Sequence, residues 1–463
     1  MTTSNQRNKT IALAAASAVA LIGAAWLGGS VYAGKKAEAE LRRLVTESTA
    51  SKSYRLTNLN HRGGILGSDG SIDLSLVDEC EAPGAAPLFS AKINYQFSNL
   101  IMPTSLARFE WAVEPTGEAK AVFEKVFGGQ AKLEGKGKVG FSGNLRSDMN
   151  LPEMRWASSG AVVTVSSSTG FIDANKDTLA FDWTTPKISM RGNGEALEAE
   201  GLGMQMDLTS VKRGLGSFSL SLDKLATGMG SAEGMQITSE VVARGDRLDM
   251  TITPNVKSIS GGGKNFKDLV IQIAINGLHA NSIEHLLALS QSSCNFRNLT
   301  QDEEKAMRAS VRTLLFEGFS AGIQKIGGTM DGDSLDGKLM IELIKTVGQE
   351  FKLEEALKSN GSLVLKGKNL DPDSKKTLVS LGFATETPEG LKAEFSYAGA
   401  ILKVNGKAMD ATVMSTVAAG MNDGINAFLS GKPLVSMHLP APAAEAPAEE
   451  TEEEAMPPAQ EES

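Results

Sequence analysis

An uncharged apolar segment from Ile11 to Gly34 limits what this chain can become more than any other stretch. At ~1.5 Å of rise per residue, a helix over this segment is ~36 Å long, enough to cross a ~30 Å hydrocarbon core. Basic residues stand on both sides of the segment, and everything after Lys36 is too polar to enter a bilayer. The sequence therefore predicts a water-exposed body that is either anchored to a membrane or exported across one.

The apolar segment has features of both a retained anchor and a cleaved signal. Residues 31–33, Val-Tyr-Ala, would serve as a small-residue cleavage site. The apolar run is longer than a signal peptide needs and continues into a helix-like stretch over 37–50, so we favour the anchor. The basic residues after the segment outnumber those before it, which by the positive-inside rule favours a cytoplasmic body. The short basic head favours export, and we place the body outside.

Composition excludes some classes of partner. The apolar content of 41% and charged content of 22% are ordinary for a globular protein. Nearly all of the net charge of −9 comes from glutamates in the tail over 441–463, which has no Lys or Arg. The rest of the chain is close to neutral and has no basic field for nucleic acid. With only 4 Trp and 4 Tyr, the chain also has few platforms for stacking bases or sugars.

The chain has two cysteines, Cys80 and Cys294, and no Cys-x-x-Cys motif. In an exported protein, two cysteines are either one disulfide or two buried thiols, and the sequence does not decide between them. The lack of a Cys-x-x-Cys motif leaves no indication of a redox or zinc site.

Hydrophobic periodicity predicts an α+β fold in which an N-terminal transmembrane helix precedes a mainly antiparallel β-sheet body. Strands with period-two alternation occupy most of 54–113 and 131–274, with further strands at 338–347, 361–366 and 391–404. Helices are expected at 118–127, 282–290, 302–326, 373–381 and 410–429, so they cluster after residue 280. The expected organisation is a cytoplasmic head (1–10), the anchor or signal (11–34), a β-rich periplasmic region (35–280), a mixed region (281–430) and a disordered acidic Pro/Ala/Glu tail (431–463).

Several short motifs suggest chemistry, but their contexts do not fit it. Residues 318–322 match the hydrolase pattern G-x-S-x-G, yet they fall inside the helix expected over 302–326 rather than on a strand-to-helix turn. Residues 173–177 and 331–336 resemble calcium loops but lack the required ligands, and we expect Asx-type turns there. The Gly-Gly-Gly-Lys of 261–264 is not a P-loop and is expected to be a loose turn.

The four histidines are scattered through the chain, and none forms a metal-ligand motif. His61 stands out because it begins the sequence His61-Arg62-Gly63-Gly64. We expect a structural turn with a hydrogen-bonded ring, with metal binding or acid/base chemistry as the alternative. The sequence thus predicts no catalytic residue, no metal and no cofactor.

Three stretches together resemble the YdgA-like family of bacterial inner-membrane-anchored periplasmic proteins. The uncharged helix ends in Gly34-Lys35-Lys36, and the element His61-Arg62-Gly63 follows near the start of the exported part. Near the end, Tyr397 precedes an alternating strand and then Asn405-Gly406, with a Met before a helix. The resemblance implies a periplasmic body held by the N-terminal helix. It implies no catalytic residues, because the biochemical role of that family is not established.

These observations favour a non-enzymatic, membrane-anchored binding or scaffold protein of the bacterial envelope. Many amphipathic strands in succession form a sheet with an apolar face, which could hold a lipid or another apolar ligand. The alternatives are a periplasmic hydrolase with a dispersed active site and an assembly partner for other envelope proteins. The expected partners are the membrane, through the N-terminal helix, and a lipid or an envelope protein, but no nucleic acid.

Overall fold

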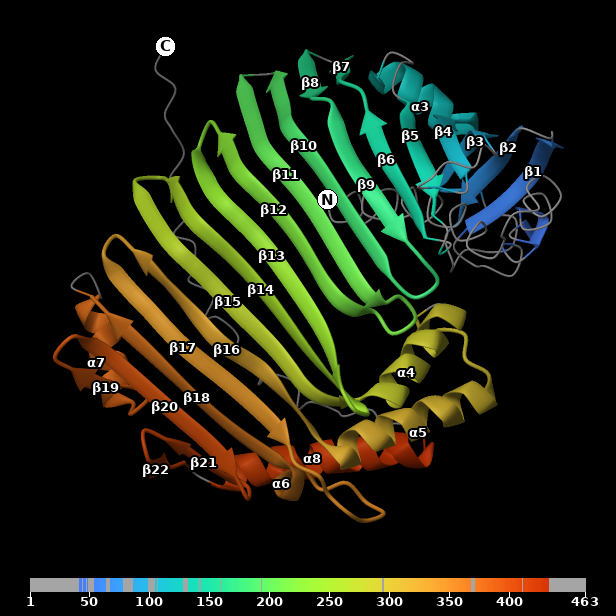
Figure 1. The fold of residues 1–463 in the computed structure, drawn as a ribbon. Coiled ribbons are helices and arrows are strands. Elements are labelled where there is room, and N and C mark those ends of the chain that lie inside the picture. The colour runs from blue at the N-terminus through green and yellow to red at the C-terminus, as the bar shows by residue number, and fades with distance from the viewer. Residues whose placement is uncertain are drawn as a thin grey trace, which may run out of the picture.

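The computed structural model describes residues 41–43, 45–46, 48, 54–63, 67–77, 86–98, 105, 107–127, 132–140, 142, 144–158, 160–192, 194–293, 295–367, 371–409 and 411–432. These residues form one long, strongly twisted antiparallel sheet with helices at its two ends (Figure 1). The prediction of a β-rich fold with mainly antiparallel pairing is confirmed.

The strands are β1 (Tyr54–Gly63), β2 (Gly67–Leu76), β3 (Phe89–Ser98), β4 (Ala107–Pro115), β5 (Leu133–Val139), β6 (Leu145–Leu151), β7 (Met154–Ser158), β8 (Ala161–Val165), β9 (Ser168–Ala174), β10 (Leu179–Gly192), β11 (Glu195–Ser210), β12 (Leu215–Thr227), β13 (Gly230–Arg244), β14 (Arg247–Gly261), β15 (Lys264–His279), β16 (Phe319–Met330), β17 (Asp333–Leu343), β18 (Leu357–Lys366), β19 (Thr385–Thr387), β20 (Gly390–Ala398), β21 (Ile401–Val404) and β22 (Lys407–Ala408). The helices are α3 (Gly117–Phe127), α4 (Ala280–Ser292), α5 (Gln301–Glu317), α6 (Leu353–Ala356), α7 (Pro372–Ser380) and α8 (Ala411–Ser430).

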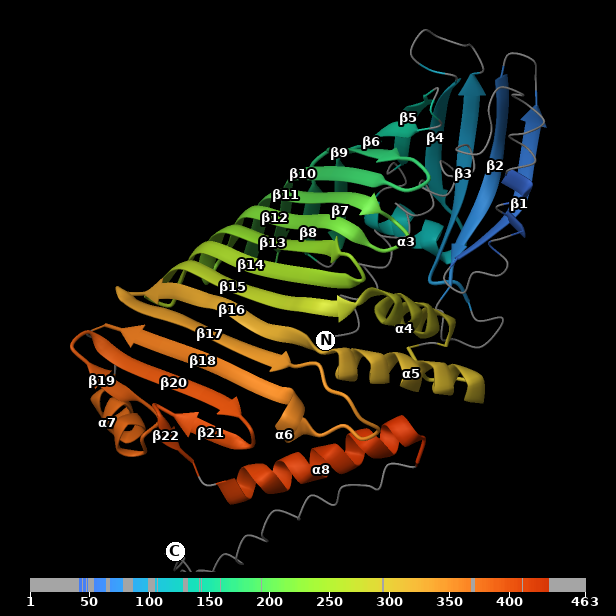
Figure 2. The same cartoon turned by 60° about the horizontal axis from the view of Figure 1, so that its bottom comes forward.

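Most strands pair with their neighbours in the chain. The order runs from β1 to β6, continues with β9 to β18, and ends with β20, β21 and β22. The short β7–β8 hairpin pairs with the far end of β10, and β19 lies beside β20. Figure 2 shows β1–β4 standing steeply against the direction of β10–β15, because the twist of each strand pair accumulates along the sheet.

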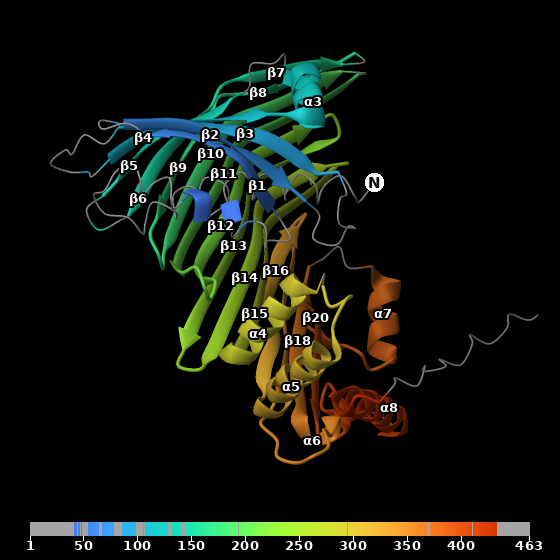
Figure 3. The same ribbon diagram turned by 90° about the vertical axis from the view of Figure 1, so that its right-hand side faces the viewer.

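Helices lie against the two ends of this sheet. Helix α3 contacts β3, β4 and β7 in the N-terminal part, whereas α4 and α5 extend from the ends of β15 and β16 and α8 packs on α5 (Figure 3). Helix α5 begins with a capping box, in which the side chains of Thr300 and Glu303 each accept a backbone N–H of the other residue. The helices at 118–127, 282–290, 373–381 and 410–429 are therefore confirmed to within a few residues.

One face of the first strands forms a closed hydrophobic core. Ile72 and Ile93 have no exposed surface, and Trp111 is 5% exposed. The Trp111 indole Nε1 donates to the hydroxyl of Ser147, 2.9 Å away, so its buried polar atom is satisfied. Phe123 of α3 covers the edge of this core, with its ring 6.3 Å from that of Phe89.

Aromatic rings on this face lie over glycines of the adjacent strand. Trp111 covers Gly135, where a Cβ would come within 2.5 Å of the indole ring. Phe109 covers Gly137 in the same way, at 2.3 Å. A side chain at either position would displace the ring, so the glycines allow large rings to lie flat on the sheet. This explains why so glycine-rich a sequence forms a well-packed sheet.

The long central strands are interrupted along one line, which we call the crease. Gly201, Gly234 and Asp268 have positive φ angles of 67°, 58° and 51° in the interiors of β11, β13 and β15. Gly201 lies beside Asp223 of β12, and Gly234 lies beside Lys257 of β14, so the interruptions line up across neighbouring strands. The crease divides each of these strands into two parts.

Two predicted elements differ from the structure. The helix predicted over 302–326 ends at Glu317, because Gly318 (φ 76°) turns the backbone and strand β16 starts at Phe319. The prediction was wrong there because Phe319 and Ile323 suit both a helical and a strand pattern. The strand predicted over 391–404 is a hairpin, since Gly399 and Ala400 have positive φ and separate β20 from β21.

The predictions for the anchor or signal (11–34), for nearly all of the acidic tail (431–463) and for Gly34, Lys35 and Lys36 lie outside the described residues. Cys80 and Cys294 also lie outside them, so the question of a disulfide stays open. Within the described ranges, no helix is both long and apolar enough to span a bilayer.

Candidate functional site

The N-terminal motif residues lie on the edge strand β1 rather than in a turn. His61 is in the strand after a bulge near Asn58, and its Nδ1 lies 3.1 Å from the Tyr95 hydroxyl. Arg62 donates through Nε to Asp69 on β2, at 3.0 Å. His61 Nε2 is buried and has no hydrogen-bond partner among the described residues. The expected hydrogen bond of the ring is present, but the expected turn is wrong.

The C-terminal motif residues hold the last hairpin together. Tyr397 on β20 is 4% exposed, and its burial raises the pKa of its hydroxyl, with a smaller contribution from the charge of Glu354. Asn405 and Gly406 both have positive φ, as the Asn-Gly turn between β21 and β22 requires. The Asn405 side chain accepts from Glu394 N at 2.9 Å. The structure therefore places the two motifs at opposite ends of the sheet and does not bring them together.

The short motifs are parts of turns and strands. Ser320 lies on β16, after a helix rather than before one, and the Asn276 amide is 3.4 Å from its hydroxyl. Asn175 accepts the backbone N–H groups of Asp177 and Thr178, which confirms an Asx-type turn. Gly262 and Gly263 form a tight hairpin turn between β14 and β15 rather than a loose one. Among the described residues, no group of His, Cys, Asp or Glu is arranged to hold a metal ion.

The most extended chemical feature is an apolar face that crosses the sheet. Strand register aligns one unbroken row of uncharged residues from β9 to β20: Ile172, Phe181, Met206, Phe218, Ser239, Ile252, Ile273, Ile323, Leu339, Gly361 and Phe395. A second row lies beside it: Leu179, Leu208, Gly216, Val241, Met250, Ile275, Ala321, Ile341 and Ser359. Because strand side chains alternate, these rows share one face.

Burial along this face falls from the N-terminal part to the middle of the sheet. Ile172 and Phe181 are 1% and 8% exposed and belong to the closed core. In β13, β15 and β17, by contrast, Ile237, Ile273 and Ile341 are 43%, 37% and 42% exposed. We call the part of this face on β12–β17 the open apolar face. An exposed apolar area of several strands is typical of an interaction site.

On the side of the crease that carries the open apolar face, the opposite face of these strands is mainly polar. In β12 the sequence Ser217-Phe218-Ser219-Leu220-Ser221 alternates hydroxyl and apolar side chains, so each type takes its own face. Strand register continues the polar face through Thr238 and Thr253 on β13 and β14. The two faces of the central sheet therefore differ sharply in chemistry.

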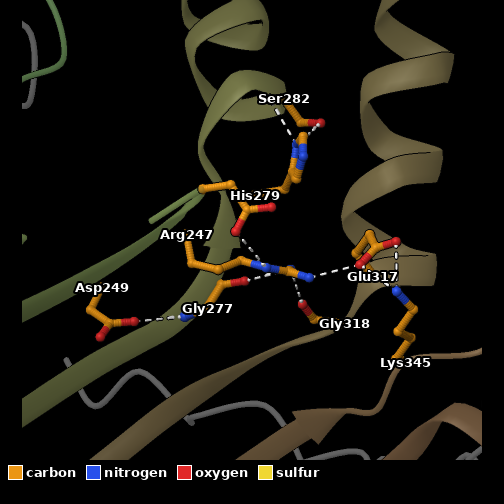
Figure 4. A network of polar contacts seen from close by, with 9 residues as sticks. Arg247, Asp249, Gly277, His279, Ser282, Glu317, Gly318 and Lys345 are labelled. Carbon is orange, nitrogen blue, oxygen red and sulfur yellow. Dashed lines mark hydrogen bonds and ion pairs between the residues drawn. The ribbon is translucent and has the colours of Figure 1, made fainter. Parts of the chain in front are cut away.

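Helices α4 and α5 adjoin one end of the central sheet, where a polar network joins α5 to β14 (Figure 4). Arg247 of β14 donates to the carbonyl of Gly277 at 3.0 Å and to Glu317 at 2.7 Å, at the last residue of α5. Glu317 also pairs with Lys345 at 3.0 Å. A second cluster anchors α8, where Phe351 is 1% exposed among side chains of α5 and α8. The helices are thus fixed to the sheet by both charge and packing.

The ion pairs of Glu317 make this junction sensitive to acid. The Lys345 ammonium, with Arg247, holds the pKa of the Glu317 carboxyl below its ordinary value of 4.5. A lowered pKa in the folded state stabilises the protein above the ordinary value, and this contribution is lost as the pH falls below 4.5. We expect Glu317→Gln to be less stable than the native protein at pH 7, with the difference shrinking below pH 4.5. Urea unfolding at several pH values measures this.

The matched control is Glu342→Gln on the exposed part of β17, for which we expect a smaller and less pH-dependent change. A stability difference for Glu317→Gln that stays constant down to pH 3 would contradict the assignment.

Sequence reasoning identified most strands of the open apolar face but not the face itself. The alternation in each strand was visible, as in residues 217–222, but which strands are adjacent and in what register was not. Arg247 and Glu317 had no motif to mark them, because their partners are remote in the chain.

The chain belongs to a known protein family. The model of the family described as "Bacterial protein of unknown function (DUF945)" matches residues 8–370. The chain is also 21% identical over 282 residues to Protein YdgA of Escherichia coli (strain K12), covering 53% of this chain and 56% of YdgA. It therefore spans about half the length of this curated relative. Both findings confirm the YdgA-like resemblance, and no solved structure matches.

Proposed function

We propose that this protein is a membrane-anchored binding protein of the bacterial envelope whose body lies in the periplasm and holds the acyl chains of a lipid on its open apolar face. One observation carries the proposal: isoleucines of the central strands are 37–43% exposed on a face with no charged residue in its two transverse rows. Leaving such a surface in water costs about 25 cal/mol per Å² of apolar area, which a bound acyl chain would recover.

The dimensions of the face suit a lipid. At ~4.8 Å per strand, β12–β17 span about 24 Å across the sheet, and one acyl chain covers roughly half of a ~30 Å hydrocarbon core. Met250 of β14 has a flexible side chain that adapts to irregular apolar ligands. The face offers few hydrogen-bonding groups, so it favours chains over polar small molecules.

The predicted anchor would keep the body next to its ligand source. Gly34 ends the apolar segment, and Leu41 is fully buried in the closed core. The six residues between them make seven Cα–Cα steps, which reach at most ~25 Å when extended. The N-terminal end of the sheet therefore stays close to the bilayer, within reach of membrane lipids.

Full-length protein purified from membranes in a mild detergent provides the test, with its bound lipids quantified by mass spectrometry. We expect near-stoichiometric lipid with the native protein. Ile237→Asp should reduce it at least tenfold, because a carboxylate would lie among the acyl chains.

The matched control is Gln236→Asp, which places the same charge on the opposite face one residue away and should retain lipid. Lipid that stays bound in Ile237→Asp, or no lipid with the native protein, would overturn the proposal and favour a protein partner for this face.

A further inference from the structure

The open apolar face ends at a row of charged residues just beyond the crease. In β12 the apolar positions Phe218, Leu220 and Leu222 are followed, at the same spacing of two, by Lys224. In β15 the positions Ile273, Ile271 and Leu269 are followed by Lys267. Side chains two residues apart point to the same side of a strand, so the face changes from apolar to charged along the strand direction.

Strand register joins these residues into one line, which we call the charged row: Lys187, Glu200, Lys224, Glu233, Ser258, Lys267 and Thr329. The adjacent row on the apolar side contains Leu222, Met235, Val256 and Leu269. The charged row therefore borders the open apolar face over several strands. The two transverse rows of the apolar face, by contrast, contain no charged residue.

The lysines of the charged row differ in their partners. Lys187 forms ion pairs with Glu198 and Glu200, at 3.3 and 3.2 Å. In the described part of the chain, Lys224 and Lys267 have no carboxylate within 4.0 Å, and both are exposed. Glu233, directly opposite Lys224 in the register, is exposed as well. Two ammonium groups are thus free to meet a ligand.

We propose that the bound lipid lies along the strands, with its phosphate-bearing headgroup on the charged row near Lys267, Ser258 and Lys224 and its acyl chains on the open apolar face. This inference rests on the proposed function. The Ser258 hydroxyl lies beside Lys267 in the register and offers a donor to the same phosphate. Glu233 faces the polar part of the headgroup rather than its chains.

The apolar track along the strands is long enough for this orientation of the lipid. Four intervals of ~6.6 Å separate the Met250 row from the charged row, about 26 Å, and an acyl chain needs roughly 15 Å. Across the strands, the face has room for a chain, but its two transverse rows contain no charged group to meet a headgroup. Only along the strands do an apolar track and a charged end occur together, as an amphiphile requires.

Full-length protein, delipidated in detergent, would be titrated with dioleoyl phosphatidylglycerol and with dioleoylglycerol, which has the same chains without a phosphate. Native mass spectrometry gives the two dissociation constants. We expect the native protein to prefer the phospholipid and the double variant Lys224→Ala, Lys267→Ala to lose about tenfold of that preference. Raising the salt from 0.05 to 0.5 M should weaken the preference in the native protein only.

Two further variants control for charge and fold. Lys257→Ala removes an exposed lysine at the same crease but on the opposite face, and it should keep the preference. The double variant Lys224→Arg, Lys267→Arg retains the charge and should keep it too.

The outcomes separate this inference from the proposed function. If the double alanine variant binds both lipids with the native preference, the headgroup site is overturned while acyl binding stands. If Ile237→Asp binds dioleoylglycerol as tightly as the native protein does, the acyl-binding function itself is overturned.

Discussion

Replacing Trp111 by alanine is expected to lower the free energy of unfolding by about 3–5 kcal/mol, one of the largest effects of any single change in this protein. The indole is 5% exposed and lies flat over Gly135, so its removal leaves a cavity that the sheet backbone cannot fill. It also leaves the hydroxyl of Ser147, which has no exposed surface, without the N–H that it accepts. Chemical unfolding followed by circular dichroism measures the change.

Trp111→Phe separates these two causes. It keeps most of the ring over Gly135 and removes the hydrogen bond, so we expect a loss of about 1–3 kcal/mol. A loss for Trp111→Ala as small as that for Trp111→Phe would show that packing over Gly135 contributes little.

The second large effect is expected at Phe351, where alanine should cost about 3–5 kcal/mol. This ring is 1% exposed and meets Phe316 of α5 edge-on, with 5.9 Å between ring centroids. The side-chain amide of Asn426 on α8 makes two hydrogen bonds to the backbone of Phe351. Its oxygen accepts from the Phe351 N–H and its nitrogen donates to the Phe351 carbonyl, both at 2.8 Å. Phe351→Ala therefore removes the packing that holds α8 against α5.

Hydrogen exchange localises this effect. We expect amides of α8 and α5 to lose protection in Phe351→Ala while amides of β3 and β4 keep theirs, because the two hydrophobic clusters share no residue. Phe351→Leu, which keeps most of the apolar volume, should cost less than half as much. A uniform loss of protection across the whole sheet would contradict this view.

Most elements of this fold are local, and the sequence predicted them for that reason. The alternation in 217–222, for example, is recognised within a few residues. The end of α5 was missed because Phe319 and Ile323 continue a helical pattern past Gly318, whose positive φ depends on the β16–β17 pairing around it. The local sequence pattern could not decide whether the residues after Gly318 continue the helix or begin a strand.

The candidate site depended on register, which no local pattern contains. Phe218 and Ile273 lie in one row only because each hairpin between them has its particular turn and length. The charged row could not be predicted for the same reason, since Lys224 and Lys267 are ordinary exposed lysines until the strand register places them in one row with Ser258. The motif residues that the sequence did single out, such as His61 and Asn405, hold the two ends of the sheet.

The strand order has a consequence for how the protein forms. Nearly every strand pairs with its neighbour in the chain, so few strand pairings have to close a long loop, which favours folding. A chain that emerges N-terminus first completes the closed core of β1–β6, β9 and β10 before β12–β17 exist. Later strands then add one at a time to a finished edge, as in repeat proteins. The chain is therefore synthesised in the order in which its strands pair. The half-exposed strands β12–β17 join the sheet only after the closed core has formed.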